Sequence, residues 1–303
     1  VAKSKNYAKL ANKTLEDLEV GASGRVDGEG NIKENLLDFA LWKAAKLGEV
    51  SWKSPWGQGR PGWHIECSVM ATSILGDTID IHGGGADLEF PHHTNEIAQS
   101  EAKTGKTFAN YWMHNGFVNV DNEKMSKSLG NFVTVHDMLK TVDGQVLRFF
   151  LATQQYRKPI NFTEKAVHDA SVNLKYLKNT FTLPLGKAVD AAELAKFKAD
   201  FEAAMDDDFN TANGITVAFD MAKWINSGNY DQVTKDTFAK MLAVFGIVFE
   251  EEVLDADIEA LIEKRQEARA NRDFATADAI RDQLAAQGIK LLDTKDGVRW
   301  TCD

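Results

Sequence analysis

Cysteine is scarce in this 303-residue sequence, and long apolar runs are missing. Two cysteines, Cys67 and Cys302, cannot build a disulfide framework, so the sequence fits a reducing, cytoplasmic setting. No apolar run approaches the roughly 20 residues that a membrane-spanning helix needs, and no secretory signal is recognisable. We therefore expect a protein without membrane association.

An excess of basic residues is missing as well, because the formal net charge is -10. This charge argues against non-specific coating of nucleic acid but leaves room for a local basic surface that docks one RNA. The hydrophobic content of 44% and the charged content of 26% are ordinary for a globular protein. The length allows two or three domains. The first residue is Val1 and not methionine, and the sequence starts within a pattern, which suggests a fragment or a processed chain.

The first 120 residues carry the pattern of an α/β protein. Residues 1–50 are polar, with short strand-like pieces and no evident core of their own. The stretch "SPWGQGRPGWHIECS" begins with the glycines and prolines typical of a loop, and it predicts a helix that starts near Trp63. In "DTIDIHGGGADLEF" a buried strand at 78–82 runs into a glycine-rich loop before a helix, and ligands bind at the carboxyl ends of such strands.

Helical periodicity takes over in the second half of the chain. Apolar residues recur every three or four positions in four successive segments, the first of which starts near Thr163. The other three cover residues 194–201, 215–225 and 238–245. Four such segments in a row predict an antiparallel helix bundle.

The C-terminal residues predict a separate small unit. After an acidic link, "FEEEVLDAD", we expect one further helix over about 257–287. The tail "IKLLDTKDGVRWT" then has strand–turn–strand character, with Asp296-Gly297 as its turn.

The stretch "FPHHTNE", residues 90–96, places two histidines between a proline and a glutamate. Pro91 suits the first turn of a helix, where its missing N–H costs nothing. In a helix, His92 and Glu96 stand four positions apart on one face, while His93 points elsewhere. An imidazole and a carboxylate in this arrangement form half of a zinc site. Without a third ligand, an exposed helix with a weak His–Glu pair is the simpler interpretation.

A loop that carries lysines, "NEKMSKSLGN", occupies residues 122–131. Lys124 and Lys127 flank serines in it, and mobile positive charge of this kind can close on a nucleotide triphosphate and neutralise a leaving pyrophosphate. A solvated lysine loop is the plain alternative, but the full K-M-S-K-S string followed by L-G-N is rarely accidental. It resembles the second hallmark of class I aminoacyl-tRNA synthetases.

Four further stretches extend this resemblance to one family, the cysteinyl-tRNA synthetases. They are "GRPGWHIECS", "DIHGGGADLEFPHHTNEIAQSE", "MDDDFNTANGITVAFDMA" and "RDFATADAIRDQL". The resemblance covers nearly the whole chain and corresponds to the last two thirds of the family's usual length. It implies an α/β plus all-α fold: the second half of a class I Rossmann-type catalytic domain, then a helix bundle and a small C-terminal α+β module.

The resemblance also implies five regions along the chain. They are a remnant of a connective insertion (1–50), the second half of the Rossmann domain (51–121), the K-M-S-K-S loop with a stem-contact region (122–162), an antiparallel, tRNA-binding helix bundle (163–250) and an anticodon-recognition module (251–303). The family's H-I-G-H motif belongs to an N-terminal part that this sequence lacks. We therefore expect this chain alone to be an incomplete catalytic unit.

One zinc ion per chain is a further implication of the resemblance. The family binds it through cysteine, histidine and glutamate, and the matching positions here are Cys67, His92 and Glu96, with His93 uninvolved. A borderline-soft ion suits such ligands, and the family's fourth ligand is a cysteine near its N-terminus. The ion would select cysteine by its thiolate, because size alone separates cysteine from serine poorly.

The substrate positions follow from the same resemblance. Trp63 would wall the cysteine pocket, Asp87 would pair with the substrate ammonium, and His82 would face the same pocket. Structural roles for these three residues are the alternatives. Lys124 and Lys127 would act in catalysis, and Lys127 would bind ATP, which the family uses with Mg²⁺.

The expected C-terminal helix carries Arg265, Arg269 and Arg272 at helical spacing on one face. In the family this region reads the anticodon, and Arg269 and Asp278 match the family's pattern there. Arginine can bind a guanine edge with two hydrogen bonds, and unstacked anticodon bases expose such edges. A solvated face with internal ion pairs, such as Arg269 with Asp273, is the alternative.

The resemblance thus implies a monomeric, cytoplasmic ligase that activates L-cysteine with ATP and esterifies it to tRNA(Cys). Class I enzymes achieve activation by positioning and charge stabilisation, so we expect no side-chain nucleophile. Three alternatives stand beside it. A related ligase that acts on an amino sugar would need no anticodon module, and a zinc hydrolase with Glu96 as base would need no K-M-S-K-S loop. A non-catalytic tRNA-binding fragment is the third.

Overall fold

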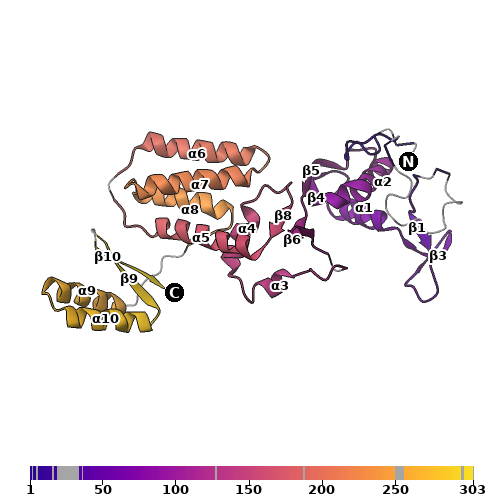
Figure 1. The fold of residues 1–303 in the computed structure, drawn as a ribbon. Coiled ribbons are helices and arrows are strands. Elements are labelled where there is room, and N and C mark those ends of the chain that lie inside the picture. The colour runs from indigo at the N-terminus through magenta and orange to yellow at the C-terminus, as the bar shows by residue number, and fades with distance from the viewer. Residues whose placement is uncertain are drawn as a thin grey trace. The chain divides into compact units, whose positions relative to one another are not determined.

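The computed structural model describes most of the chain, in two units (Figure 1). The described residues are 1, 3–4, 6–15, 17–18, 34–35, 37–126, 128–186, 188–249, 256–294 and 297–302. The first unit runs from Val1 to Val248 and the second from Phe249 to Asp303. Among the described helices, none is both long and apolar enough to cross a membrane.

The residues before the first helix form a small antiparallel sheet. Its strands lie in the order β1-β3-β2 and comprise Trp42–Ala44 (β1), Trp52–Ser54 (β2) and Gly57–Pro61 (β3). Tyr7 and Leu18 are buried, with Phe39 and Phe90 packed against them. The first 50 residues thus contribute an apolar cluster, which they share with Phe90 and Ala98 instead of forming a core of their own.

A β–α–β unit with a parallel strand pair positions the candidate site. Its elements are α1 (Trp63–Ile74), β4 (Ile79–Gly85), α2 (Thr94–Thr104) and β5 (Ala109–Asn115). Ile79 pairs with Ala109 and Gly85 with Asn115, so the two strands run side by side over their whole length. The predicted helix at Trp63 is confirmed. Phe108, which is fully buried, packs with Ile79 under the helices.

Strand β4 is longer than the sequence indicated. It was expected to end at residue 82, before a glycine loop, but it continues through the glycines to Gly85. A Cβ on Gly83 would lie 2.9 Å from the carbonyl oxygen of Met113 on β5. The glycines therefore serve close packing of the two strands rather than a free loop.

The segment between β4 and α2 becomes helical at Pro91, as the sequence predicted, but its first turn is wide. A 3-10 turn (Ala86–Leu88) and a wide turn (Glu89–His93) come first, and the regular helix begins at Thr94. Phe90 has φ -137° and ψ 128°, which is extended. A residue before proline is biased towards this region, so the helix cannot pass through it.

A second small sheet follows, in the order β7-β6-β8. Its strands are Val118–Val120 (β6), Glu123–Lys124 (β7) and Ile160–Phe162 (β8), with α3 (Val135–Met138) and α4 (Gly144–Ala152) between β7 and β8. Strands β6 and β8 are parallel. Asp143 caps α4 by accepting hydrogen bonds from two backbone N–H groups, as N-cap acids do.

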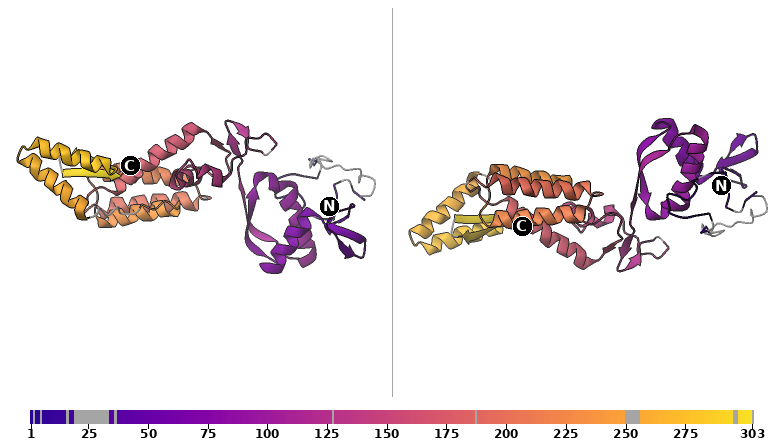
Figure 2. Two further views of the ribbon diagram at one scale, coloured as in Figure 1. Left: turned by 90° about the horizontal axis from the view of Figure 1, so that it is seen from below. Right: turned by 90° about the horizontal axis from the view of Figure 1, so that it is seen from above.

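Four helices then pack together, as the periodicity predicted (Figures 1 and 2). They are α5 (Glu164–Phe181), α6 (Ala191–Asp206), α7 (Thr211–Asn226) and α8 (Gln232–Val244). The side chains of Leu177, Met221 and Phe238 are fully buried between them. Thr163 accepts a hydrogen bond from Ala166 N, so the first helix begins where the sequence placed its cap.

The C-terminal unit contains two helices where the sequence predicted one. They are α9 (Ala256–Ala270) and α10 (Phe274–Ala286), followed by an antiparallel hairpin of β9 (Ile289–Thr294) and β10 (Gly297–Cys302). The break has a local cause. Arg272 has φ +62°, and the Asp273 side chain accepts a hydrogen bond from Thr276 N, which starts a new helix. The strand–turn–strand prediction is confirmed, although residues 295 and 296 of the turn lie outside the described residues.

Leu177→Ala should lower the free energy of unfolding of the bundle by about 2–5 kcal/mol, because it leaves a cavity in a fully buried position. Val172→Ala on the same helix is the matched control, since Val172 is 54% exposed and should change stability by less than about 0.5 kcal/mol. Urea unfolding followed by the fluorescence of Trp224 on α7 would measure both. Equal losses in the two variants would contradict the burial pattern of α5.

Candidate functional site

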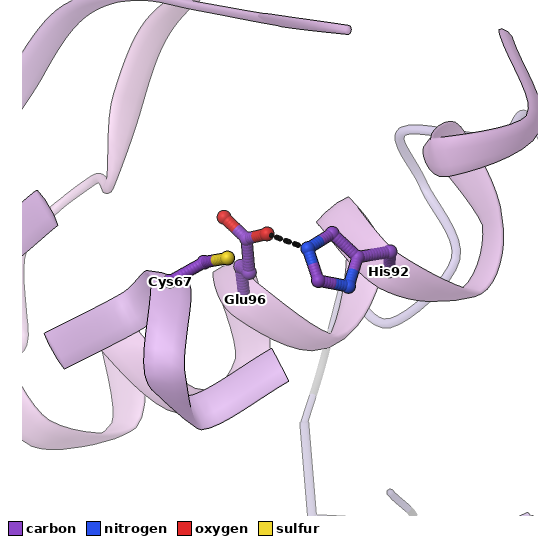
Figure 3. Close-up of side chains that lie close together, drawn as sticks. All are labelled: Cys67, His92 and Glu96. Carbon is purple, nitrogen blue, oxygen red and sulfur yellow. Dashed lines mark ion pairs between the residues drawn. The ribbon is translucent and has the colours of Figure 1, made fainter. Parts of the chain in front are cut away.

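The three residues predicted to bind zinc lie together (Figure 3). Cys67 comes from α1, and His92 and Glu96 come from the turn before α2 and from α2 itself. Their sulfur, nitrogen and oxygen atoms all lie within 4.8 Å of one another. His92 Nε2 is 2.6 Å from Glu96 Oε1, so the predicted i, i+4 pair is present. Glu96 is only 1% exposed, which excludes the alternative of a surface pair.

The same carboxylate serves a second set of groups. His82, at the middle of β4, places Nε2 at 2.9 Å from Glu96 Oε2. His82, His93 and Glu96 also have ligand atoms within 4.8 Å of one another. His93 was expected to point away from the His92–Glu96 pair; it is 2% exposed and belongs to this second set, not to the set that contains Cys67. Two overlapping sets of donors therefore share one buried carboxylate.

Five of the seven histidines gather around this carboxylate. His64 Nδ1 lies 2.8 Å from His92 Nδ1, and His93 Nδ1 lies 2.8 Å from His114 Nε2. The rings of His82 and His93 are 4.7 Å apart between centroids. In each 2.8 Å contact, the protonated nitrogen of one ring donates a hydrogen bond to the unprotonated nitrogen of the other ring. Each histidine of a pair therefore fixes the tautomer of its partner.

His64 and His114 were not singled out from the sequence. A signal for the first exists in hindsight, because His64 stands three positions before Cys67 on the same helix. His114 comes to the site only through the register of the strands, in which it pairs with Gly84. That register cannot be read from either strand alone.

Burial governs the ionisation of this cluster. It lowers the pKa of His93 to about 3, helped by the neighbouring His82, and it lowers the pKa of His114 and of His92, although Glu96 acts in the opposite direction on His92. Burial also raises the pKa of the Cys67 thiol, and Glu96 adds to this effect. The imidazoles of His92, His93 and His114 are therefore neutral at pH 7 and able to donate lone pairs, whereas the thiol needs a cation before it loses its proton.

The residues predicted to contact the substrate surround this cluster. Trp63 is 48% exposed, and its ring lies 4.2 Å from that of His92 between centroids. His82 is half-buried, with its ring edge-on to Trp112. Asp87 is exposed, and its Oδ1 lies 2.5 Å from the place that a Cβ on Gly85 would take. Any larger residue at Gly85 would displace that carboxylate.

The K-M-S-K-S loop is described in part. Lys124 is exposed, and its Nζ lies 4.0 Å from the centroid of the Phe117 ring in a cation–π contact. Asn131 closes the loop, because its side chain accepts a hydrogen bond from Ser126 N and donates one to Lys124 O. Lys127 lies outside the described residues.

Comparison with known proteins assigns the whole chain. Residues 1–172 match the model of the tRNA synthetases class I (C) catalytic domain, residues 200–250 a DALR domain, and residues 251–300 a cysteinyl-tRNA ligase anticodon binding domain. A cysteine–tRNA ligase of Streptococcus agalactiae serotype V is 83% identical over all of this chain and 68% of the relative. One of Streptococcus thermophilus is 84% identical with the same coverage. The chain belongs to the cysteine–tRNA ligase family.

Among solved structures, the LeuRS–tRNA–LeuAMS ternary complex of Agrobacterium radiobacter aligns at 15% identity and a TM-score of 0.46, over 64% of this chain and 32% of that one.

The C-terminal unit of this cysteine–tRNA ligase family member holds the arginines that the sequence pointed to. Arg265 is 5% exposed and donates to both carboxylate oxygens of Asp293, at 2.8 and 2.9 Å. Arg269 pairs with the same acid and stays 43% exposed. The suggested partner Asp273 instead caps α10, and Arg272 falls in the break between the helices. The three arginines therefore do not share one helix face.

Asp278 and its neighbour Phe274 lie on α10, and both are accessible. Asp278 is 3.1 Å from the Nη1 atom of Arg281, with 63% of its side chain exposed. Phe274 is 61% exposed at the start of the helix. An exposed acid and an exposed ring on the first turns of α10 leave groups free to meet an RNA base.

Asp293→Asn should destabilise the C-terminal unit at pH 7, and the difference from wild type should disappear towards pH 2. The hydrogen bonds from Arg265 lower the pKa of Asp293 to about 2 in the folded chain, whereas an unfolded aspartate titrates near about 3.9. The contribution of this ion pair is thus complete above about pH 4 and is lost as the pH falls to about 2. Calorimetric unfolding of both proteins from pH 7 to pH 2.5 (about two steps per unit) would follow it.

The control for this measurement is Asp282→Asn, an exposed acid on α10 whose side chain is 73% accessible. An exposed pair contributes little, so this variant should match wild type throughout. A constant difference between Asp293→Asn and wild type at every pH would show that the substitution acts through packing and not through charge.

Proposed function

We propose that the chain serves the ATP-dependent activation of L-cysteine and its esterification to tRNA(Cys). Its relatives are named cysteine–tRNA ligases, which supports this reaction. The observation that carries the proposal is the contact of the Cys67 thiol with the His92–Glu96 pair, a donor set suited to selecting a second thiolate. The match of residues 251–300 to an anticodon binding domain disfavours an amino-sugar ligase.

Zinc fits the residues present. A thiol, an imidazole and a carboxylate converge within 4.8 Å, and these are common zinc ligands. Glu96 Oε2 and His82 Nε2 are buried 2.9 Å apart, but their geometry is not that of a hydrogen bond, and no other described residue bonds to either atom. Two buried lone-pair donors without a hydrogen-bond partner are suited to binding a cation. When bound, zinc would supply a Lewis acid for the thiolate of the substrate cysteine. Serine has a hydroxyl group in place of this thiolate.

The residues around the metal ligands would hold the rest of the substrate. The Trp63 ring lies against His92 and is 48% exposed, so it would cover the cysteine side chain. Asp87 presents an exposed carboxylate beside the glycines of β4, a suitable partner for the α-ammonium group. The contact of His82 with Glu96 places its ring beside the metal ligands.

Lys124 and Lys127 would act on the triphosphate. Activation builds negative charge on the departing pyrophosphate, and a lysine that reaches it stabilises that charge. The Phe117 contact gives Lys124 a resting position that it can leave, since such contacts contribute only about 0.5–1 kcal/mol at exposed sites. No side-chain nucleophile is required, because cysteine's own carboxylate attacks the nucleotide.

The remaining regions would bind tRNA, with the bundle and the C-terminal unit contacting different parts of it. The DALR and anticodon-binding matches support this division. Arg269 and Asp278 would contact anticodon bases, and we expect a cytoplasmic monomer.

The proposed zinc site predicts that the purified chain binds one zinc, that Cys67→Ala loses it, and that His93→Gln keeps it. His93 is buried, so glutamine is chosen to preserve its volume. Elemental analysis after dialysis against limiting chelator would give the stoichiometry. Loss in His93→Gln with retention in Cys67→Ala would instead place the metal in the triad of His82, His93 and Glu96.

The same proteins test the function by charging of tRNA(Cys) with cysteine and with serine. Joined to the remaining third of a Streptococcus relative, the zinc-loaded wild-type chain should charge cysteine only, and Cys67→Ala should lose the preference. A chain that binds zinc and tRNA(Cys) but charges no tRNA, even when its residues 1–303 are joined to the remaining third of a Streptococcus relative, would support the alternative of a non-catalytic tRNA-binding protein.

For the anticodon, Arg269→Ala should weaken tRNA(Cys) binding by about 1–3 kcal/mol, the value of one two-bond base contact. The loss should vanish on tRNA whose contacted anticodon base has been changed, which forms a double-mutant cycle. Arg272→Asn is the control, since asparagine tolerates the φ of +62° and Arg272 should contact no base. Equal weakening on every anticodon would assign Arg269 to a phosphate.

A further inference from the structure

The loop between α6 and α7 has an unusual backbone. Asp208 has φ +54° and Phe209 has φ +51°, the left-handed region that residues other than glycine rarely adopt. Aspartate tolerates it, but for phenylalanine it is strained. These residues belong to the "MDDDFNTA" stretch, to which the proposed chemistry gives no role. Strain of this kind persists only where surrounding contacts hold it.

Those contacts come from a segment some fifty residues earlier in the chain. Arg157 donates from Nε and Nη2 to the two carboxylate oxygens of Asp208, at 2.5 and 3.1 Å. The Tyr156 hydroxyl donates to the same carboxylate at 2.8 Å. Close by, Thr211 Oγ1 donates to Gln154 O at 2.8 Å. The bundle is therefore tied to residues 154–157 by four hydrogen bonds.

Asp208 and Arg157 are roughly half exposed, and an isolated pair of this kind would contribute little. This pair differs in two respects. The guanidinium fork meets both carboxylate oxygens, which fixes direction as well as distance. Tyr156 adds a third donor, and the hydrogen bonds from Arg157 and Tyr156 lower the pKa of Asp208. The acid is therefore held in one geometry.

The tied segment leads directly to the candidate site. Gly116 N, just after β5, donates to Tyr156 O at 2.7 Å. A Cβ on Gly116 would stand 2.4 Å from Lys158 O, so the two backbones are in direct contact. Two residues before Gly116, His114 contacts His93 beside the buried Glu96. The path from the bundle loop to the histidine cluster is thus continuous.

We propose that Asp208 is a positioning residue for this site. By fixing Arg157 and Tyr156, it holds residues 154–158 against the end of β5, and so sets the position of His114 and of its partner His93. The bundle, which would bind tRNA, is thereby coupled to the pocket that would hold cysteine. The coupling of tRNA binding to the cysteine pocket rests on the proposed function, whereas the coupling of Asp208 to β5 does not.

Asp208→Asn tests the coupling in the full chain without any substrate. Asparagine tolerates the left-handed backbone but loses the charge that orients Arg157. Amide hydrogen exchange at Gly116 should become about ten-fold faster, and the imidazole NMR signals of His114 and His93 should shift. Asp207→Asn is the matched control, an adjacent exposed acid that should leave both readouts unchanged.

A partner variant sharpens the test. Arg157→Gln should accelerate exchange at Gly116 by a similar factor, and the double variant with Asp208→Asn should add little to either. Unchanged exchange at Gly116, additive effects, or the same acceleration in Asp207→Asn would overturn the proposal. So would a uniform acceleration across α1 and α7, which would signal general destabilisation.

Charging of tRNA(Cys) then separates the two proposals. If the protein charges tRNA, Asp208→Asn should lower kcat about ten-fold while the KM for cysteine changes less than two-fold, because the metal ligands are untouched. If the wild-type chain charges no tRNA even when joined to the remaining third of a Streptococcus relative, the proposed function fails, and the exchange at Gly116 still decides the role of Asp208.

Discussion

The buried carboxylate of Glu96 is the constraint on which the catalytic half depends. A carboxylate that is 1% exposed costs several kcal/mol unless neighbouring groups compensate for lost water. Two imidazoles, of His92 and His82, approach its two oxygens, and a thiol lies beside it. These groups come from α1, β4 and the start of α2, so the packing of the β–α–β unit and the chemistry of the site cannot be changed independently.

The N-terminal segment is part of this arrangement. The Tyr7 hydroxyl donates to the Asn95 side chain at 2.5 Å, directly beside Glu96 on α2. Burial raises the pKa of Tyr7 to about 12, so the hydroxyl keeps its proton as a donor throughout the neutral range. Gly84 also packs closely here, since a Cβ on it would stand 3.0 Å from the His93 ring. Tyr7 and Gly84 thus both contact the segment 93–95 that follows His92.

Features that depend on local spacing were predictable from the sequence, and features that depend on register were not. The i, i+4 geometry of His92 and Glu96 and the four bundle helices follow from helical periodicity. The approach of His114 follows only from the pairing of β4 with β5. The break at Asp273 was not predicted, because the helical pattern of the sequence continues on both sides of it. In the structure the Asp273 side chain accepts a hydrogen bond from Thr276 N, and this bond starts a new helix.

Asp293 shows why two interpretations of the C-terminal arginines are compatible. Arg265 is buried and donates a hydrogen bond from each of its terminal nitrogens to this acid, so these two nitrogens have a structural role. Arg269 reaches the same acid through Nη1 and remains 43% exposed. A guanidinium held at one edge has already lost much of its rotamer freedom, so binding a base with its other edge costs less. On the proposal that Arg269 contacts an anticodon base, the ion pair would preorganise its side chain instead of competing with that contact.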